Sequence, residues 1–486
     1  MNNINTLTQA SIALKFGKTT SVELTQKCIQ RIESIDENIG CYLCVDKIGA
    51  MKQAIDSDAR RKFNQSLGEL DGIPIGIKDM ISCKGLPLNA SSKILQDYLA
   101  SYDATVIRNL RSKGAVIIGK LNQDEFGMGS SGENSAYKIC KNPVNLSRTP
   151  GGSSSGSAAA IAANLAFGTL GTDTGGSVRQ PAAFTGTVGI KPTYGRVSRF
   201  GVIAFASSLD QVGVFGHKVE DAATLLSGIA GYDEQDSTSI KISVPNYNLT
   251  LNRDIKGVRI GIPKEYLNKD VALDPEVKTC VENAISRLRT LGAKVYFISL
   301  PHVHLSVAAY HIISTAEASS NLARYDGIRY GPRIGFEGGF KNLYKETRGK
   351  LFGAEVKRRI LLGTFVLSAS CYDSYYIKAQ KIRSLIVDDF RNAFTLVDAI
   401  ICPTVPSVAY PLGERINDPL KMYLGDIFTI PANLAGLPGI SIPGGFSKEN
   451  LPIGIQLIGR PFEESNILNI AHMLEKILKI NNEPVK

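Results

Sequence analysis

The chain has no tryptophan, and its five histidines and eight cysteines are few for 486 residues. Eight cysteines spread over this length are too sparse for a disulfide framework. Cys41 and Cys44 form one C-x-x-C pair, but neither a second pair nor a nearby histidine completes a metal-ligand pattern. The histidines are scattered as well. We therefore expect reduced thiols and no metal or cofactor in this chain.

Long apolar runs are also absent. The sequence contains no stretch of about 18 apolar residues, which excludes a membrane-spanning helix. Its first residues lack the basic start, the apolar block and the small-residue cleavage site of a secretory signal, and they do not form the arginine-rich segment of a transit peptide. These absences predict a cytoplasmic protein without membrane contact.

The composition is that of an ordinary folded protein, with 43% hydrophobic and 21% charged residues. Because the length exceeds one usual hydrophobic core, we expect either one large α/β unit with an insertion or two domains. The net charge of +10 suits an anionic partner such as nucleic acid or an acidic protein, but dispersed surface lysines explain it equally well. No long basic run decides between these interpretations.

Helices and strands are predicted along the whole chain, which favours a layered α/β architecture. Thr20 and Glu23 form a capping box ahead of a helix over about 21–35, and a second helix is expected over 47–64. The segment GIPIGIKDM after Asp71 is a short buried strand. We expect N-terminal helices over 1–65 and a catalytic unit over 66–486. The parts of that unit are a core at 70–235, a mostly helical insertion at about 305–394, and C-terminal strands with a helix at 397–480.

The centre of the chain, residues 149–192, places two loops rich in glycine and serine around an alanine-rich apolar segment. Such loops offer backbone N–H groups and hydroxyls with little side-chain bulk. In the second loop Ser177 follows Thr174, Gly175 and Gly176, whose N–H groups are suited to hold a developing oxyanion. A serine nucleophile needs a base, and the histidines offer none. Lys78 stands at the end of a strand, where α/β sheets bind ligands, although a snorkelling surface lysine is the simpler interpretation.

Four familiar motifs are matched only superficially. Residues 114–120 match a P-loop, but Leu121 stands where a serine or threonine must hold Mg²⁺. GMGSSG at 127–132 matches a dinucleotide pattern without a preceding strand, and residues 135–138 spell S-x-x-K without its partner motifs. GSSSG at 152–156 matches the nucleophile elbow of α/β-hydrolases, but no strand precedes it and His217 is a poor partner. We discount all four.

The central stretch, together with GIPIGIKDM upstream, resembles the amidase signature family in the order and spacing of its motifs. The resemblance covers most of the chain. It implies an α/β fold with a central mixed β-sheet covered by helices on both faces, and it implies amide hydrolysis by a Ser–cis-Ser–Lys triad. In that triad Ser177 is the acylated nucleophile, Ser153 the bridging cis-serine and Lys78 the base. Burial of Lys78 is then required, because desolvation lowers the pKa of an ammonium group.

Within this family, four further segments resemble the glutaminase subunits of tRNA-dependent amidotransferases, namely 317–331, 352–365, 370–383 and 422–443. This resemblance implies that glutamine is hydrolysed and that its ammonia passes to a B subunit. That subunit binds ATP and Mg²⁺ and converts Glu-tRNA(Gln) to Gln-tRNA(Gln), a ligase reaction of protein biosynthesis. A small C subunit completes the heterotrimer, and charged tRNA is contacted mainly through the partner.

The same resemblance implies how glutamine is held. Arg359 is assigned to its α-carboxylate, Asp426 to its α-ammonium, and Tyr310 to the wall of the pocket. Arg358 is the alternative clamp, because it neighbours Arg359 in a basic run. Two other functions stay open from the sequence: a stand-alone amidase that hydrolyses small amides, and a non-catalytic glycine-rich binding protein.

Overall fold

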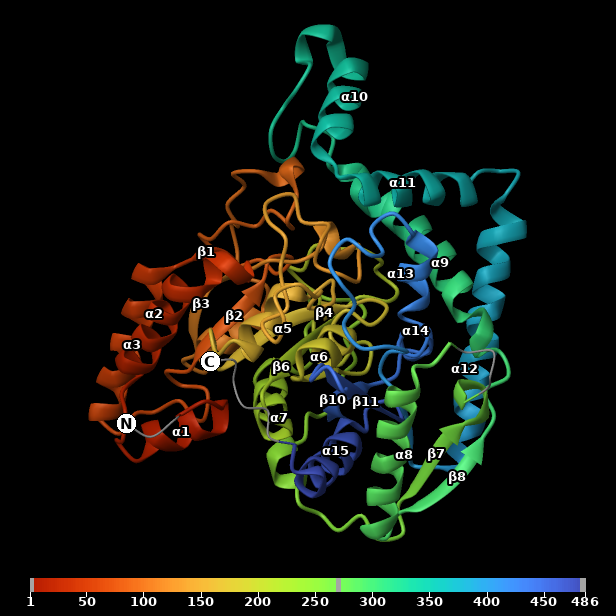
Figure 1. The fold of residues 1–486 in the computed structure, drawn as a ribbon. Helices are drawn as coiled ribbons and strands as arrows, with labels where there is room; N and C mark the ends of the chain where they lie inside the picture. Colours follow the sequence, from red (N-terminus) through yellow and green to blue (C-terminus); the bar gives the residue numbers. More distant parts are fainter. Residues whose placement is uncertain (1–3, 268–271, 481–486) are drawn as a thin grey trace.

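The computed structural model describes residues 4–267 and 272–480. Its described strands form one sheet in the order β1-β3-β2-β4-β6-β5-β10-β11-β9-β7-β8 (Figure 1). The strands are β1 (Tyr42–Val45), β2 (Pro74–Lys78), β3 (Val116–Leu121), β4 (Gly168–Asp173), β5 (Val188–Lys191), β6 (Gln211–Gly216), β7 (Arg259–Pro263), β8 (Lys294–Ile298), β9 (Ala399–Pro403), β10 (Gly439–Phe446) and β11 (Pro452–Gly459).

The sheet is mixed, as expected. Strand β2 runs parallel to both β3 and β4, and β7 runs parallel to both β8 and β9. The other neighbouring strands pair antiparallel, including β10 and β11 near the C-terminus. Since β2 and β4 are parallel neighbours, their carboxyl ends lie at the same edge of the sheet. This is the edge at which α/β proteins bind their ligands.

Among the described elements, helices lie between most consecutive strands, but not between β5 and β6 or between β10 and β11. They are α1 (Leu7–Lys15), α2 (Ser21–Ile39), α3 (Lys47–Lys62), α4 (Thr105–Ser112), α5 (Ser155–Ala162), α6 (Arg179–Thr185), α7 (Val219–Ile229), α8 (Pro275–Thr290), α9 (Ser306–Asn321), α10 (Gly339–Leu351), α11 (Ala354–Val366), α12 (Lys378–Leu396), α13 (Pro419–Leu424), α14 (Ile430–Leu434) and α15 (Glu464–Leu478). None of the helices in the described part of the chain is long and apolar enough to cross a membrane.

Local sequence signals account for the N-terminal elements. The capping box predicted at Thr20 and Glu23 is present, and α2 ends at Gly40 with φ 83°, a conformation that suits glycine. The helix expected over 47–64 is α3. The N-terminal segment 1–65, which was expected to contain only helices, also supplies strand β1, which pairs antiparallel with β3. The boundary at residue 65 stays a prediction, while the sheet continues across it.

Helices cover both faces of the sheet, as strand β4 demonstrates. A Cβ atom added at Gly168 would lie 3.0 Å from Leu225 of α7, whereas one added at Gly171 would lie 2.8 Å from Ser154 beside α5. These two positions point to opposite faces because side chains alternate along a strand. Helices α9, α11 and α12 belong to the predicted helical insertion, and α10 projects from the body of the molecule (Figure 1).

Candidate active site

Strand β2 ends in a lysine whose side chain is fully buried. The Nζ atom of Lys78 lies 2.8 Å from Ser153 Oγ and 2.9 Å from Ser154 Oγ, and 3.5 Å from the carbonyl oxygen of Thr172 at the end of β4. The snorkelling surface lysine is therefore excluded. The parallel pairing of β2 with β4 brings Lys78 to the serine-rich loop that precedes α5.

The peptide bond between Gly152 and Ser153 is cis, as the family resemblance implies. The Gly152 N–H donates to Gln180 Oε1 at 2.9 Å, and the Ser153 carbonyl accepts the N–H of Asp124 at 3.2 Å. A Cβ atom at position 152 would lie 2.1 Å from Asp124 Oδ2, so the close approach of this carboxylate requires glycine. The loop before α5 is thus held by residues from two other segments.

Ser177 follows the glycine pair in the loop after β4 and is 8% exposed. Its carbonyl oxygen accepts the N–H of Ser154 at 3.3 Å, which joins the two glycine–serine loops. Within the described residues, the hydroxyls of Ser177 and Ser153 share no direct hydrogen bond. The structure therefore brings Lys78, Ser153 and Ser177 into one buried region, with Ser154 as a second hydroxyl on the lysine.

Burial lowers the pKa of Lys78 to about 7 from its ordinary 10.5. The negative charges of Asp124, Asp173 and Asp210 oppose this change, but the loss of hydration outweighs them. A lysine with this pKa is partly uncharged near neutral pH. It is then able to accept a proton, which an ordinary lysine does only in strongly alkaline solution.

A buried ion pair organises the loop that carries Ser177. Arg179 donates to both carboxylate oxygens of Asp173, from Nε and Nη2 at 3.1 Å each, and neither side chain is exposed. Burial raises the pKa of Asp173, but Arg179 outweighs this effect and holds it at about 2. Asp173 also accepts the N–H of Gly176 at 2.8 Å and that of Val178 at 3.1 Å.

The amides predicted to hold an oxyanion are therefore not equivalent. The Gly176 N–H is already engaged by Asp173. The N–H groups of Thr174 and Gly175 have no protein acceptor within the described residues. A Cβ atom on Gly175 would lie 2.7 Å from Cζ of Tyr310, so this glycine lets the tyrosine ring approach the loop.

The three residues assigned to glutamine form a second cluster, in which Tyr310 and Arg359 are buried and Asp426 is partly buried. Arg359 of α11 donates from Nε to Glu355 Oε1 at 2.8 Å, and its guanidinium lies 5.5 Å from the ring centroids of both Phe205 and Tyr423. The alternative clamp, Arg358, pairs with Glu355 as well, but its side chain is 43% exposed. Of the two arginines, only Arg359 is buried in this cluster.

Asp426 has one satisfied and one free carboxylate oxygen. Its Oδ2 atom accepts the Ser130 hydroxyl at 2.6 Å, whereas its buried Oδ1 atom has no hydrogen-bond partner among the described residues. Burial raises the pKa of Asp426 to about 7, partly offset by the Ser130 hydroxyl. An unpartnered buried oxygen of this kind is suited to accept a hydrogen bond from a substrate cation.

Several residues of the site were not singled out from the sequence. Ser154 directly follows Ser153, and Asp173 and Arg179 flank Ser177 within the central stretch. Charged residues inside an otherwise small and apolar segment are the signal that would have identified the pair. Ser130 and Glu355 carried no comparable local signal.

One of the discounted motifs has a structural explanation. Lys120, the lysine of the apparent P-loop, lies inside β3 and pairs with the buried Asp79 at 3.2 Å. Among the described residues, no group of three His, Cys, Asp or Glu side chains is arranged to hold a metal ion.

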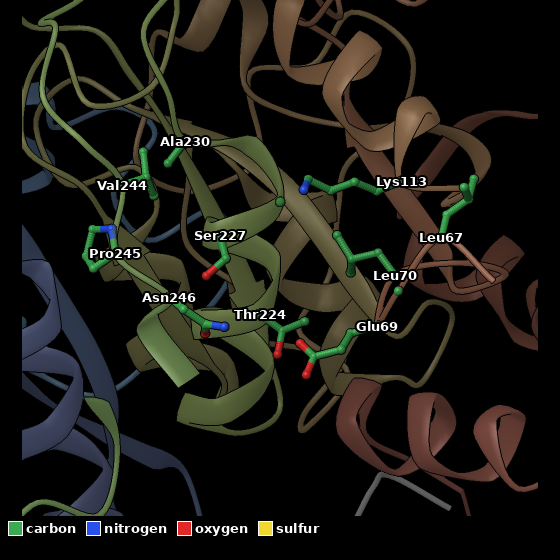
Figure 2. A pocket seen from close by; sticks show the side chains of 12 residues that line it. Leu67, Glu69, Leu70, Lys113, Thr224, Ser227, Ala230, Val244, Pro245 and Asn246 are labelled. Carbon is green, nitrogen blue, oxygen red and sulfur yellow. The ribbon is translucent and has the colours of Figure 1, made fainter. Parts of the chain in front are cut away.

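A cleft of about 350 Å³ is separate from this site. Its lining side chains are shown in Figure 2. It is bounded by the loop before β2, the end of α4, helix α7 and a later loop; its lining residues include Leu67, Glu69, Lys113, Thr224, Ser227 and Asn246. Because the 67–70 loop precedes β2, the cleft lies at the opposite end of this strand from Lys78. It is not the catalytic pocket.

Known proteins are similar to this chain over nearly its whole length. The A subunit of the glutamyl-tRNA(Gln) amidotransferase of Myxococcus xanthus is 51% identical over 471 residues, covering 97% of this chain and 96% of the relative. The A subunit from Acidobacterium capsulatum is 52% identical over 467 residues, covering 96% of this chain and 98% of the relative.

Two solved structures are also similar. The A subunit of the Thermotoga maritima glutamyl-tRNA(Gln) amidotransferase has a TM-score of 0.78 at 41% identity and covers 94% of this chain and 91% of its own. The native peptide amidase of Stenotrophomonas maltophilia has a TM-score of 0.82 at 29% identity, and the match covers 100% of this chain and 99% of the amidase. The family model described as Amidase matches residues 23–468. The buried lysine and the two serines of the central loops agree with this match. The chain belongs to the amidase family.

Proposed function

We propose that this chain is the glutamine-hydrolysing A subunit of a glutamyl-tRNA(Gln) amidotransferase. The observation that carries the proposal is the buried amine of Lys78, 2.8 Å from the hydroxyl of Ser153 and joined through Ser154 to the Ser177 loop. The names of the relatives that match nearly the whole chain support the same function.

In the proposed mechanism Ser177 is the nucleophile. Ser153 accepts the hydroxyl proton of Ser177 while its own proton passes to the uncharged amine of Lys78. The Ser177 oxygen attacks the side-chain amide carbon of glutamine. The proton returns through Ser153 to the leaving nitrogen, and ammonia departs. Water then hydrolyses the glutamyl ester and regenerates Ser177 with glutamate as product.

The proposed oxyanion donors are the amides of Thr174, Gly175 and Gly176. Because Gly176 already donates to Asp173, the amides of Thr174 and Gly175 are the main donors in this proposal. The Asp173–Arg179 pair holds the loop before the substrate arrives. Preorganised donors of this kind stabilise negative charge without having to reorient during the reaction.

Glutamine is proposed to bind between the two clusters. The guanidinium of Arg359 pairs with its α-carboxylate, and the free Oδ1 atom of Asp426 accepts its α-ammonium. The ring of Tyr310, which lies against Gly175, separates these charged groups from the reacting amide. Holding both α-substituents leaves only the side-chain amide free to approach Ser177.

The ammonia is proposed to pass to a B subunit within a heterotrimer that includes a small C subunit. The B subunit binds ATP and Mg²⁺ and uses the ammonia to convert Glu-tRNA(Gln) to Gln-tRNA(Gln). Charged tRNA is contacted through the complex, and the reaction takes place in the cytoplasm. The relatives are named as one subunit of an amidotransferase, which supports such an assembly.

The test is a glutaminase assay on the purified chain, alone and with its B and C subunits, charged tRNA and ATP. We expect glutamine hydrolysis that the partners and tRNA stimulate. High turnover of simple aliphatic amides without stimulation by the partners would identify a stand-alone amidase instead. If no amide is hydrolysed under either condition, the chain is a non-catalytic binding protein.

A further inference from the structure

Glu125 connects the two clusters of the site. It follows Asp124, whose N–H binds the Ser153 carbonyl, and its side chain is buried against a different part of the chain. Its Oε2 atom accepts the N–H of Gly353 at 2.9 Å, and its Oε1 atom accepts the hydroxyl of Ser92. The carboxylate therefore joins the loop that supports Ser153 to a distant segment of the chain.

That segment is the start of the helix that carries Arg359. Gly353 is the N-cap of α11, and it has no side chain that could cap the helix. The first N–H groups of a helix lack intrahelical acceptors, so Glu125 Oε2, which accepts the Gly353 N–H, serves as the cap. Arg359 lies about two turns further along the same helix.

The junction is closely packed. A Cβ atom at position 353 would lie 2.2 Å from Glu125 Oε2, so the carboxylate reaches the helix only because residue 353 is glycine. Next to this contact, the ring of Phe126 lies 5.7 Å from that of Phe352 and 5.0 Å from that of Tyr325. The start of α11 is thus fixed to the segment at 124–126, which supports Ser153, by one hydrogen bond and an aromatic cluster.

We infer that Glu125 is a positioning residue, which sets the distance between Arg359 and the reacting serines and thereby determines the preference for amides that carry an α-carboxylate. The inference rests on the proposed function, because it requires Arg359 to bind that carboxylate. Glu125 does not touch the substrate. It acts through α11, whose displacement moves Arg359 but leaves Lys78, Ser153 and Ser177 in place.

The experiment compares two substrates in the full chain, glutamine and 4-aminobutanamide, which has the same reacting amide and the ammonium group but no carboxylate. In Glu125→Ala we expect kcat/KM for glutamine to fall about tenfold or more, mainly through KM, with 4-aminobutanamide nearly unaffected. Glu125→Gln keeps an acceptor for the Gly353 N–H and a group that reaches Ser92, so we expect the preference to return to within about twofold of the wild type.

The Arg359→Ala variant distinguishes failure of the proposed carboxylate clamp from failure of the inference about Glu125. If it leaves the preference for glutamine unchanged, the proposed clamp is wrong. If it removes the preference while Glu125→Ala does not, the inference about Glu125 is overturned.

Gly353→Ala decides the question if Glu125→Ala does not fold. Its methyl group meets the carboxylate and displaces the helix start, so the preference for glutamine should fall here as well. An unchanged preference in a folded Gly353→Ala protein also overturns the inference.

Discussion

Lowering the pH perturbs the proposed base directly. Because burial lowers the pKa of Lys78 to about 7, about nine tenths of the molecules have a neutral lysine at pH 8 and about one tenth at pH 6. Only the neutral amine accepts the proton from Ser153. We therefore expect kcat for glutamine hydrolysis to fall about tenfold for each pH unit below 7.

In the free enzyme, Asp426 is a second group that must lose its proton before glutamine binds. Burial raises its pKa to about 7, and only the ionised carboxylate attracts the ammonium of glutamine. Once glutamine is bound, its ammonium keeps Asp426 ionised, so this group does not affect kcat. It does affect kcat/KM, which we expect to fall about a hundredfold for each pH unit below 7, since both Lys78 and Asp426 must lose a proton.

The assay measures initial rates of glutamate formation between pH 5.5 and 9 at constant ionic strength, over a range of glutamine concentrations. Asp426→Asn is the matched control, because it removes the second titration and leaves Lys78 intact. In this variant log kcat/KM should fall with a slope of about one below pH 7, against about two in the wild type. A kcat that stays flat from pH 8 to pH 6 would refute the neutral-lysine mechanism.

Three further predictions concern the same loops. Ser177→Ala should eliminate the glutamyl ester that mass spectrometry detects on the central loop of the wild type after acid quenching; an adduct that persists would assign the nucleophile elsewhere. Gly152→Ala should lower Tm by several degrees, because its Cβ atom would lie 2.1 Å from the Asp124 carboxylate, whereas Gly349→Ala on α10, with no atom within 4 Å, should leave Tm nearly unchanged. Arg179→Met should cost about 3–5 kcal/mol of unfolding free energy in urea, since it leaves the buried carboxylate of Asp173 unpaired. A loss below about 1 kcal/mol would show that this carboxylate is not charged as described.

The local sequence determined most of the elements. The capping box at Thr20, the apolar periodicity of 21–35 and the short apolar run before Lys78 each predict one helix or strand, and α2 and β2 lie where they were expected. Such signals are legible because helix caps and periodic burial depend on neighbours along the chain. The residues proposed as the triad were also named from the sequence, through the resemblance of its motifs to the amidase signature family.

Only the tertiary structure decided which groups meet. Strand order in the sheet departs from chain order, and the parallel pairing of β2 with β4 is what brings Lys78 to the serine loop. The sequence assigned Arg359 to the carboxylate but left Arg358 open as the alternative, whereas the structure buries Arg359 and exposes Arg358. Burial and the charges that surround a group arise from segments far apart in the sequence. The pKa of Lys78 and the free oxygen of Asp426 therefore follow from long-range packing, which no local pattern records.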